Sequence, residues 1–299
     1  TEEYKKLNLK FHRITNIKHI YSFLNNEKFS SAIFLDHSMN NVSQAILCNK
    51  LAKNYFVFWG HPVSTGSANV DFFLSSKLMD ENNQDHYSEK LILLDGIGFN
   101  YKIDEKLRNI KNKQFKDNSL FIPQGLFKFL PKYDYIIGKI LDQNKSSHIF
   151  LIEDKDPFYT QKLIKRFKRI KQIKENFHRI TFLKGMKQVS FYETLSEQKI
   201  IIDTIGWSGG NTTMEALYLD KPVVTIIGKN LRSNHTAAIL KQLELNELIA
   251  KNYSEFLSLI KNLNENKDFY ESTVSKINEN KHLIFNKQIS LFDEVKNFI

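Results

Sequence analysis

The chain has 299 residues, of which 41% are hydrophobic, and a formal net charge of +10. This length and apolar content are enough for two domains with buried cores. No apolar run approaches the roughly 20 residues of a membrane-spanning helix, and the single cysteine, Cys48, excludes an internal disulfide framework or a zinc site built from several cysteines.

The positive charge is spread along the chain, and its densest cluster runs from Lys162 to Lys174. Within this cluster Leu163, Phe167, Ile170 and Ile173 recur at helical spacing. The pattern predicts one amphipathic helix with a solvated basic face, and it favours such a helix over a nucleic-acid-binding or membrane-binding surface. We therefore expect no nucleic-acid partner and no membrane span, and the cysteine content favours a cytoplasmic location.

In chain order, a polar helical segment up to residue 30 is followed by a strand at 31–37, a helix at 42–51 and a strand at 55–59. His37 stands at the end of the first strand, and His61 lies in the turn after the second. Ligands bind at the carboxyl edge of open parallel sheets, so both histidines are candidate site residues. Each is equally compatible with a structural role in its loop.

Two further strands are expected at 70–74 and 90–94. The sequence Asp95-Gly96-Ile97-Gly98 that follows lacks a third glycine and a helical start, which argues against a dinucleotide-binding fingerprint. Residues 101–117 are polar, basic and weakly periodic. We place a domain boundary there, which gives domains 1–115 and 116–299.

The second half of the chain alternates strands with helices. Strands are expected at 119–123, 148–152, 179–183 and 223–227 and in the run beginning at Ile200, and helices at 131–142, 162–174, 190–197 and 236–243 and in a tail from 253 to 299. This alternation predicts a doubly wound parallel sheet.

The most informative stretch is Ile200 to Leu217, in which an apolar strand precedes a glycine turn and a helix. The first N–H groups of a helix lack intrahelical partners and attract anions. Gly209 and Gly210 allow close approach of the backbone to a diphosphate. The next polar side chains suit phosphate oxygens or a helix cap, and they are Asn211, Thr212 and Thr213.

Glu215 lies one turn into that helix. A carboxylate there would repel phosphate, so we expect it to accept hydrogen bonds from the hydroxyls of a ribose. Taken alone, the motif is equally compatible with a capped strand-to-helix turn that binds nothing.

The stretch Trp207 to Leu217, with Lys221-Pro222-Val223-Val224-Thr225 and Gly228, resembles the catalytic region of the O-GlcNAc transferase / SPINDLY family, which includes bacterial cytoplasmic N-glycosyltransferases. The similarity extends to the turn Trp59 to Ser67, to Tyr87-Ser88-Glu89-Lys90-Leu91 and to Leu245 to Ala250. Several motifs agree in order over nearly the whole chain, which is more specific than the glycine turn alone.

The resemblance implies the GT-B architecture, in which two Rossmann-like domains with parallel sheets face a cleft, and we expect the first domain to be incomplete at its amino end. It implies an inverting, metal-independent transferase that uses a UDP-sugar and needs no cofactor. It places the lysine of the diphosphate site on Lys128, within the segment that starts at Gln124, the threonine-rich helix start on Gly210 to Thr213, and the ribose-binding acid on Glu215.

The chain departs from the family pattern at several positions. Where animal members have a histidine in the helix-start motif, this sequence has Gly210 or Asn211, and where they have a lysine and a histidine further upstream, it has Gln188 and Phe191. Backbone groups around Met186 to Val189 would then hold the uracil. The histidine usually assigned as catalytic lies upstream of this chain, so His61 and His37 are the local candidates for a base, on chemical grounds only.

The sequence therefore predicts a glycosyltransferase that moves GlcNAc or a hexose from a UDP-sugar to a side chain of a protein or peptide acceptor. The alternative is a catalytically incomplete module that binds a nucleotide-sugar or a protein. The predicted donor site consists of Gln124, Lys128, Gly209, Gly210, Asn211, Thr212, Thr213 and Glu215.

Overall fold

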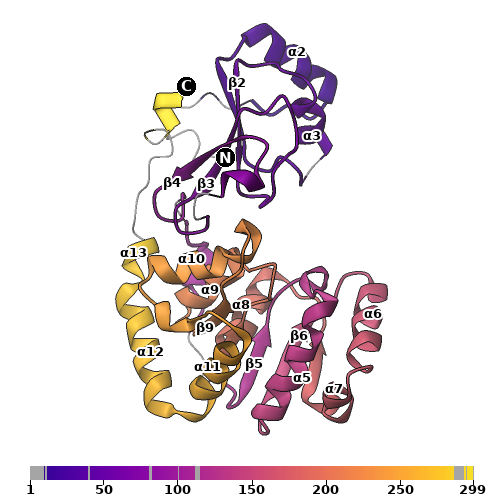
Figure 1. Cartoon of the computed structure of the whole chain (residues 1–299), viewed down its shortest axis with the longest axis vertical. Coiled ribbons are helices and arrows are strands. Elements are labelled where there is room, and N and C mark those ends of the chain that lie inside the picture. The colour runs from indigo at the N-terminus through magenta and orange to yellow at the C-terminus, as the bar shows by residue number, and fades with distance from the viewer. Residues whose placement is uncertain are drawn as a thin grey trace. The chain divides into compact units, whose positions relative to one another are not determined.

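The computed structural model describes residues 10, 12–39, 41–80, 83–99, 101–111, 115–285, 293 and 295–298. It is an α/β protein with two sheets, shown in Figure 1. Contacts divide the chain into two compact units. The first is formed by described residues of Thr1–Ser75, Asn82–Leu93 and Phe292–Ile299, and the second by those of Ser76–Glu81 and Leu94–Leu291.

The first sheet has four strands in the order β1-β2-β3-β4. They are β1 (Ser31–Phe34), β2 (Asn54–Phe58), β3 (Phe72–Ser76) and β4 (Lys90–Leu94), accompanied by helices α2 (Ile17–Glu27) and α3 (Asn41–Leu47). β1 pairs with β2, and β2 with β3, in parallel. Bulky apolar side chains such as Phe56 and Phe73 are fully buried and form the core around this sheet.

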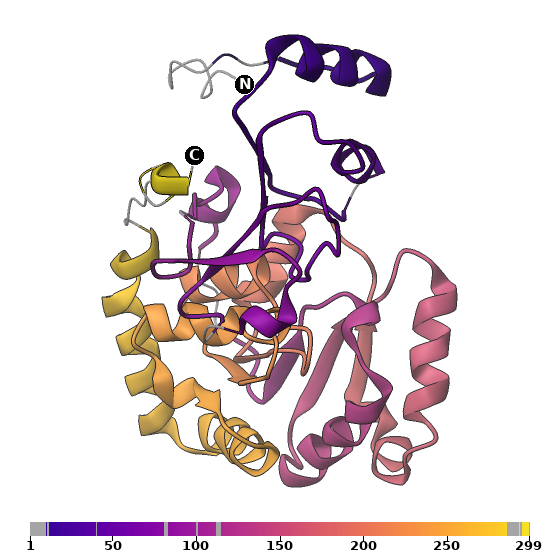
Figure 2. The ribbon, with the colours of Figure 1, turned by 45° about the horizontal axis from the view of Figure 1, so that its top comes forward.

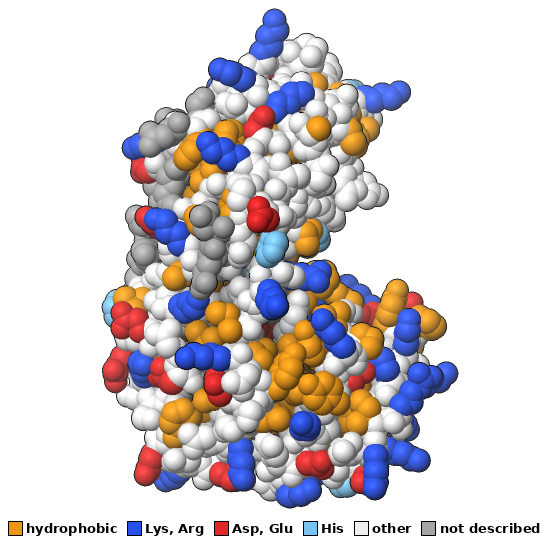
Figure 3. All heavy atoms as spheres, viewed as in Figure 1, with side chains coloured by type: hydrophobic (Ala, Val, Ile, Leu, Met, Phe, Trp, Pro, Cys, Tyr) orange, Lys and Arg blue, Asp and Glu red, His pale blue; other side chains and the backbone are white. Residues whose placement is uncertain are grey.

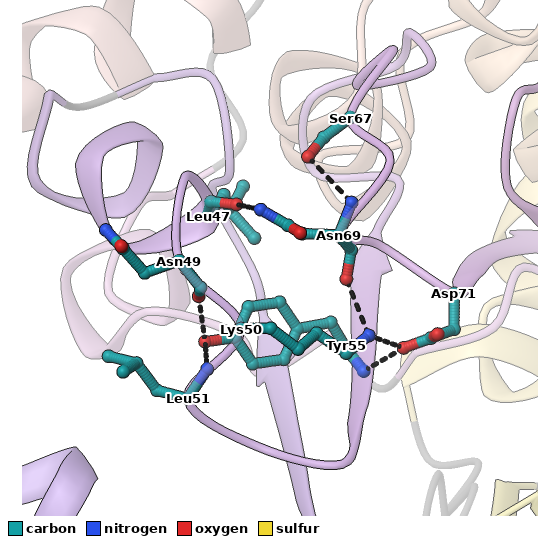
Figure 4. A network of polar contacts seen from close by, with 8 residues as sticks. All are labelled: Leu47, Asn49, Lys50, Leu51, Tyr55, Ser67, Asn69 and Asp71. Carbon is teal, nitrogen blue, oxygen red and sulfur yellow. Dashed lines mark hydrogen bonds and ion pairs between the residues drawn. The ribbon is translucent and has the colours of Figure 1, made fainter.

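Polar contacts fix the loops at the amino ends of β2 and β3 (Figure 4). The backbone N–H of Tyr55 donates to Oδ2 of Asp71 at 2.6 Å, and the ammonium of Lys50 binds the same carboxylate and the carbonyl of Asn69. The hydroxyl of Tyr55 donates to the carbonyl of Asn49 at 2.8 Å. These bonds satisfy backbone groups that the sheet leaves unpaired, so the register of β2 against β3 is well defined.

The second sheet has six strands in the order β10-β9-β8-β5-β6-β7. They are β5 (Ser119–Ile122), β6 (His148–Ile152), β7 (Ile180–Leu183), β8 (Ile200–Ile202), β9 (Val223–Ile226) and β10 (Ile249–Ala250). Neighbouring strands pair in parallel. The chain order reverses between β5 and β8, and ligands of doubly wound folds bind at the carboxyl end of such a reversal.

Helices connect these strands, and Figure 2 shows α6 beside the strands that it joins. The helices are α4 (Glu105–Arg108), α5 (Asp134–Gln143), α6 (Pro157–Phe167), α7 (Lys171–Glu175), α8 (Gln188–Ser196), α9 (Asn211–Tyr218), α10 (His235–Gln242), α11 (Tyr253–Glu265), α12 (Lys267–Asn280) and α13 (His282–Phe285). The alternation of strands and helices and the parallel pairing confirm the predicted α/β class and doubly wound sheet. The expected helical tail is present as α11 to α13, and the rest of it lies largely outside the described residues.

The basic cluster differs from its prediction, because it forms two helices instead of one. α6 ends at Phe167, and the residue before α7, Ile170, has extended backbone angles of φ −94° and ψ 119°. In one continuous helix Phe167 and Ile173 would point about 120° apart. The break at Ile170 allows both side chains to be fully buried.

The two compact units do not coincide with the predicted division at 115/116. The described residues between Leu94 and Leu291 group with the second unit, where Leu107 of α4 is fully buried and Lys106 donates to Gln188 of α8 at 3.2 Å. Packing on α8 therefore holds a segment whose polar composition resembles that of a linker.

Arg166 provides a test of how polar contacts stabilise the second unit. Its guanidinium donates to both oxygens of the buried carboxylate of Asp134, at 2.5 and 2.8 Å, and to the carbonyl of Phe129 at 2.6 Å. Removing one partner leaves a buried charge uncompensated. We expect Arg166→Ala to lower the free energy of unfolding in urea by about 3 kcal/mol.

The matched control is Arg169→Ala, because Arg169 is exposed three residues further along. This variant should change the free energy of unfolding by less than about 0.5 kcal/mol. Equal effects of the two substitutions would show that the ion pair contributes nothing beyond the loss of an arginine.

Candidate functional site

The candidate site lies where the order of the second sheet reverses. The turn after β5 carries Gln124 and Lys128, and the turn after β8 runs from Asp203 to the start of α9. Because β5 and β8 are neighbouring parallel strands, their carboxyl ends are adjacent. The structure therefore brings together the two segments that the resemblance assigned to one donor site.

Asp203 organises the turn after β8. It is buried, and its carboxylate accepts hydrogen bonds from the hydroxyls of Ser208 at 2.6 Å and Thr225 at 2.7 Å and from the backbone N–H groups of Gly209 at 2.7 Å and Thr204 at 2.9 Å. Burial raises the pKa of Asp203, although the hydrogen bonds and the charge of Lys128 oppose the increase. These four donors fix the path of the backbone into the glycine turn.

Lys128 and Gln124 connect the two turns. The ammonium of Lys128 donates to Oε1 of Gln124 at 2.8 Å and to the carbonyl of Ser208 at 3.0 Å. Nε2 of Gln124, which is buried, donates to the hydroxyl of Thr212 at 2.6 Å. A cavity of about 280 Å³ adjoins Gln124 at the ends of β5 and β6. The lysine is thus held in place by acceptors from both turns.

The N-terminal end of α9 faces this arrangement. Its N-cap residue, Gly210, provides no side-chain cap for the helix. Gly209 allows close packing, because a Cβ there would lie 2.4 Å from Nε2 of Gln124 and 2.9 Å from the hydroxyl of Thr212. Asn211 is exposed. An N-terminus without a side-chain cap, beside a lysine, suits a bound diphosphate.

Thr213 differs from its predicted neighbours, because its side chain points inward. Its hydroxyl is buried and lies 2.8 Å from the hydroxyl of Thr236 at the start of α10. The backbone N–H of Thr236 donates to the hydroxyl of Ser208 at 2.8 Å, and its hydroxyl donates to the carbonyl of Gly209 at 3.1 Å. The side chain of Thr213 therefore anchors α9 to α10.

Two basic groups, half-buried Lys128 and buried His235, set the electrostatics of the site. Burial lowers the pKa of Lys128, and the charge of Asp203 opposes that change. Burial and the charge of Lys128 lower the pKa of His235 to about 3, so this imidazole is neutral at pH 7. Nδ1 of His235 would lie 4.0 Å from a Cβ at Gly210. An anion at the N-terminus of α9 would favour the charged form of Lys128.

Glu215 lies one turn into α9 and is half-buried. Burial raises the pKa of its carboxyl group to about 7, and the charge of Asp104 adds to the increase. The hydroxyl of Tyr192 donates to Oε1 of Glu215 at 3.3 Å. The amide of Gln188 donates to the hydroxyl of Tyr192 at 2.8 Å and to Asp104 at 3.2 Å. Gln188, a departure from the family pattern, thus helps to hold the partner of Glu215.

His61 belongs to the first unit. It follows β2, and its carbonyl accepts a hydrogen bond from Nε2 of His37 at 3.1 Å. His37 is fully buried, and its Nδ1 accepts from the hydroxyl of Ser38 at 2.7 Å. Burial lowers the pKa of both histidines. His37 is therefore a structural group that positions the turn, whereas the ring of His61 is partly exposed and neutral at pH 7.

Glu89 joins two of the motifs that carry the resemblance. This buried carboxylate accepts from the backbone N–H of Thr65 at 2.7 Å, from the hydroxyl of Ser64 at 2.8 Å and from the hydroxyl of Thr65. Burial alone would raise the pKa of Glu89, but these hydrogen bonds lower it below its usual value. The turn that follows His61 is thus fixed by a residue at the start of β4.

The structure gathers the predicted donor-site residues at one end of the second sheet, with the side chain of Thr213 turned inward. Sequence reasoning assigned no role to Asp203, Ser208, Tyr192 or Thr236. The signal for Asp203 was present, because it is a carboxylate directly after the apolar strand Ile200–Ile202. The contacts of Tyr192 and Thr236 cross between helices, so spacing in the sequence could not reveal them.

Within the described ranges, no cluster of three or more histidine, cysteine, aspartate and glutamate side chains could hold a metal ion. None of the helices in the same ranges combines the length and the apolar character needed to cross a membrane.

The model of glycosyl transferase family 41 matches residues 126–295, which is more than half of the chain. The match begins two residues after Gln124, covers the remaining predicted donor-site residues and includes Asp203.

Relatives are found among plant proteins named as probable UDP-N-acetylglucosamine–peptide N-acetylglucosaminyltransferases SPINDLY. The protein of Arabidopsis thaliana is 26% identical over 251 residues, which are 81% of this chain and 27% of that protein. The protein of Solanum lycopersicum is 25% identical over 247 residues, which are 80% of this chain and 26% of that protein. The chain thus spans about a quarter of the length of these curated relatives.

Solved structures show the same fold. A mutant of the O-GlcNAc transferase of Thermobaculum terrenum matches with a TM-score of 0.84 at 16% identity, over 99% of this chain and 57% of that one. A glycosyltransferase of Rickettsia africae matches with a TM-score of 0.55 at 13% identity, over 99% of this chain and 87% of that one. The resemblance of the motifs, the sheet topology and the family match agree, and the chain belongs to glycosyl transferase family 41.

Proposed function

We propose that this chain binds a UDP-sugar where β5 and β8 meet and transfers the sugar to a side chain of a protein acceptor. The observation that carries the proposal is the arrangement of Lys128, Gln124 and the N-terminus of α9, which concentrates positive charge and hydrogen-bond donors at one end of the sheet. The names of the SPINDLY relatives include a UDP-N-acetylglucosamine donor and a peptide acceptor.

Transfer breaks the bond between the anomeric carbon and the diphosphate oxygen, and the acceptor atom forms a new bond to that carbon. In an inverting reaction the acceptor attacks from the opposite side, and its proton passes to a base. Lys128 and the N–H groups of α9 would stabilise the negative charge that develops on the leaving UDP. These groups can supply that stabilisation without a metal ion. For the base we propose the neutral imidazole of His61.

Glu215 would hold the ribose in this proposal. In its ionised form the carboxylate accepts two hydrogen bonds, which matches the paired hydroxyls of a ribose. The hydroxyl of Tyr192 already orients one oxygen. The uracil would contact backbone groups around Met186 to Val189, the segment that includes Gln188.

The alternative function is a module that binds the nucleotide-sugar or a protein without catalysing transfer. Titration calorimetry with UDP tests the donor site, and transfer or hydrolysis of a radiolabelled UDP-sugar tests catalysis. Absence of binding at millimolar UDP would reject the donor site, and tight binding without turnover on any protein acceptor would favour the module.

Lys128→Met tests the diphosphate contact. A charge-assisted hydrogen bond to phosphate is worth about 1.5 to 3 kcal/mol, so the substitution should weaken UDP binding roughly 10-fold to 150-fold in calorimetry. Lys174→Met is the matched control, because Lys174 is exposed on α7, and its UDP affinity should equal that of the wild type. An unchanged affinity of Lys128→Met would mean that Lys128 holds the two turns together and makes no contact with the diphosphate.

Gly209→Ala tests the close packing of the glycine turn. The added Cβ would meet Nε2 of Gln124 at 2.4 Å, and Gln124 is itself held by Thr212 and Lys128. We expect UDP affinity to fall roughly ten-fold because the displaced amide releases Lys128. Gly185→Ala serves as the control, since a Cβ there would have no neighbour within 4 Å. Equal UDP affinities of the two variants would contradict the predicted role of Gly209.

Glu215 predicts a pH dependence of donor binding. Its pKa is about 7 in the unliganded protein, and ribose hydroxyls that donate to the carboxylate favour its ionised form. Binding should therefore lower this pKa and release a proton, and the affinity for a UDP-sugar should rise as the pH increases from 6 through 7.

Calorimetry with UDP-GlcNAc in buffers of different ionisation enthalpy measures the released proton directly. The diphosphate diester of this ligand keeps its charge over the same pH range, so it does not contribute. Glu215→Gln should abolish both the proton release and the pH dependence. A variant that still releases a proton would locate the titrating group elsewhere.

A further inference from the structure

A second pocket lies in the same unit, at the carboxyl ends of β9 and β10. Its volume is about 580 Å³. Its walls come from the turn after β8, the loop after β9, the start of α11 and the segment around Tyr133, and none of its lining residues is an aspartate or a glutamate. Four of them are cations, and these are Lys132, Lys229, Arg232 and Lys251.

Contacts within the described part of the chain do not neutralise these cations. None of the four side chains forms an ion pair there, and the ammonium of Lys132 lies 4.8 Å from the centroid of the Tyr133 ring. The guanidinium of Arg232 lies 5.7 Å from the ring centroid of Trp207. Its Nε is buried and has no hydrogen-bond partner among the same residues. A buried donor without an acceptor is costly, so an incoming anion would be favoured.

The backbone adds to this positive potential. α11 has 13 residues and begins at Tyr253, and its first residue and its N-cap, Asn252, both line the pocket. A helix N-terminus carries a partial positive charge. The nearby carboxylate of Glu255 accepts hydrogen bonds from the backbone N–H of Lys251 and the amide of Asn252, both at 2.8 Å. The carboxylate of Glu255 is therefore hydrogen-bonded to groups at the start of α11.

Aromatic side chains surround the charged groups. The rings of Tyr133 and Tyr253, both of which line the pocket, lie 6.0 Å apart, and Tyr135 lies 6.3 Å from Tyr253. Tyr135 and Tyr253 are exposed. Figure 3 shows hydrophobic side chains gathered in the lower part of that view, with lysine and arginine side chains around them. Aromatic rings and cations together suit a peptide with acidic and apolar side chains.

The pocket shares a wall with the candidate donor site. Gly206 lines the pocket, and Ser208, two residues further along, connects the pocket to the candidate donor site. The carbonyl of Ser208 accepts from Lys128 at 3.0 Å, and its backbone N–H donates to the carbonyl of Arg232 at 2.8 Å. A polypeptide that occupies the pocket would therefore be held next to the place where a sugar would be transferred.

We propose that this pocket binds an acidic segment of the protein acceptor, with Arg232 and Lys229 holding its carboxylates. The proposal rests on the proposed function, since it names the class of acceptor that the same enzyme takes. The pocket shares none of its lining residues with the residues that would bind the donor.

Fluorescence anisotropy on the full chain tests this. The probes are a fluorescein-labelled peptide in which Glu and Ser alternate and the same peptide with Gln in place of Glu. We expect the Glu peptide to bind with an affinity that falls as salt increases, and the Gln peptide to bind at least ten-fold more weakly. The double variant Lys229→Gln/Arg232→Gln should bind the Glu peptide roughly ten-fold more weakly than the wild type.

The matched control is Lys162→Gln/Lys165→Gln, which removes the same charge from exposed positions of α6. It should bind the Glu peptide as the wild type does. Equal losses in the two double variants would mean that only net charge matters, and equal binding of the Glu and Gln peptides would mean that charge does not matter. Either result overturns the proposal. A third result would also overturn it, namely that the protein binds inorganic phosphate at Arg232 but does not bind the Glu peptide.

UDP titration of the same proteins separates this inference from the proposed function. If the wild type binds UDP but not the Glu peptide, the acceptor class is wrong and the donor site stands. If it binds the Glu peptide and not UDP, the donor site is wrong and the acidic-peptide pocket stands. Unchanged unfolding temperatures of the variants establish that a lost signal does not reflect misfolding.

Discussion

The candidate donor site of the second unit depends on one buried carboxylate, that of Asp203. Asp203 accepts hydrogen bonds from two hydroxyls and two backbone N–H groups within 2.9 Å and so fixes the turn that connects β8 to α9. One of those hydroxyls, that of Ser208, accepts in turn from the start of α10, and the carbonyl of Ser208 accepts from Lys128. Strand end, glycine turn, two helices and the lysine are therefore parts of one hydrogen-bonded network.

In the first unit, other buried ionisable residues fix a loop by hydrogen bonds in the same way. The buried carboxylate of Glu89 accepts from the backbone N–H of Thr65 and from the hydroxyls of Ser64 and Thr65, while buried His37 donates to the carbonyl of His61. In both units a loop at the carboxyl edge of a sheet is fixed by a buried ionisable group from a distant or neighbouring segment. Such loops gain a defined geometry at the cost of burying charge, a combination that is common at functional sites.

Much of the fold could be predicted because the strands of both sheets are apolar and β-branched or aromatic, and periodicity reports burial directly. The strand at 148–152 and the helix predicted at 190–197, which the structure has as α8 (Gln188–Ser196), follow from such patterns. The break at Ile170 could not be predicted, because it depends on which side chains of α6 and α7 reach the core. The association of α4 with α8 was equally hidden, since a polar segment shows no period when its contacts are hydrogen bonds such as that between Lys106 and Gln188.

The candidate site shows the same division. Gly209, Thr212 and Glu215 could be predicted from the sequence pattern of a strand, a glycine turn and a helix. Lys128 was predicted only through the resemblance, because 80 residues separate it from its partner Ser208. The inward direction of Thr213 depends on Thr236 and therefore on the packing of α9 against α10. Spacing in the sequence predicts which face of a helix a side chain lies on. Tertiary contacts decide whether that side chain faces a ligand or packs against a neighbouring helix.

The charges of the candidate site would favour a bound anion. Burial lowers the pKa of Lys128 and raises the pKa values of Asp203 and Glu215, so each charged form is held at a cost in the unliganded protein. Lys128 is bound to neutral oxygens of Gln124 and Ser208, and the charge of Asp203 partly compensates its own. A diphosphate at the N-terminus of α9 would provide the missing counter-charge, and the ribose hydroxyls would do the same for Glu215 by hydrogen bonding. In the unliganded site the charged forms of Lys128 and Glu215 are therefore unfavourable, and the proposed donor would stabilise both.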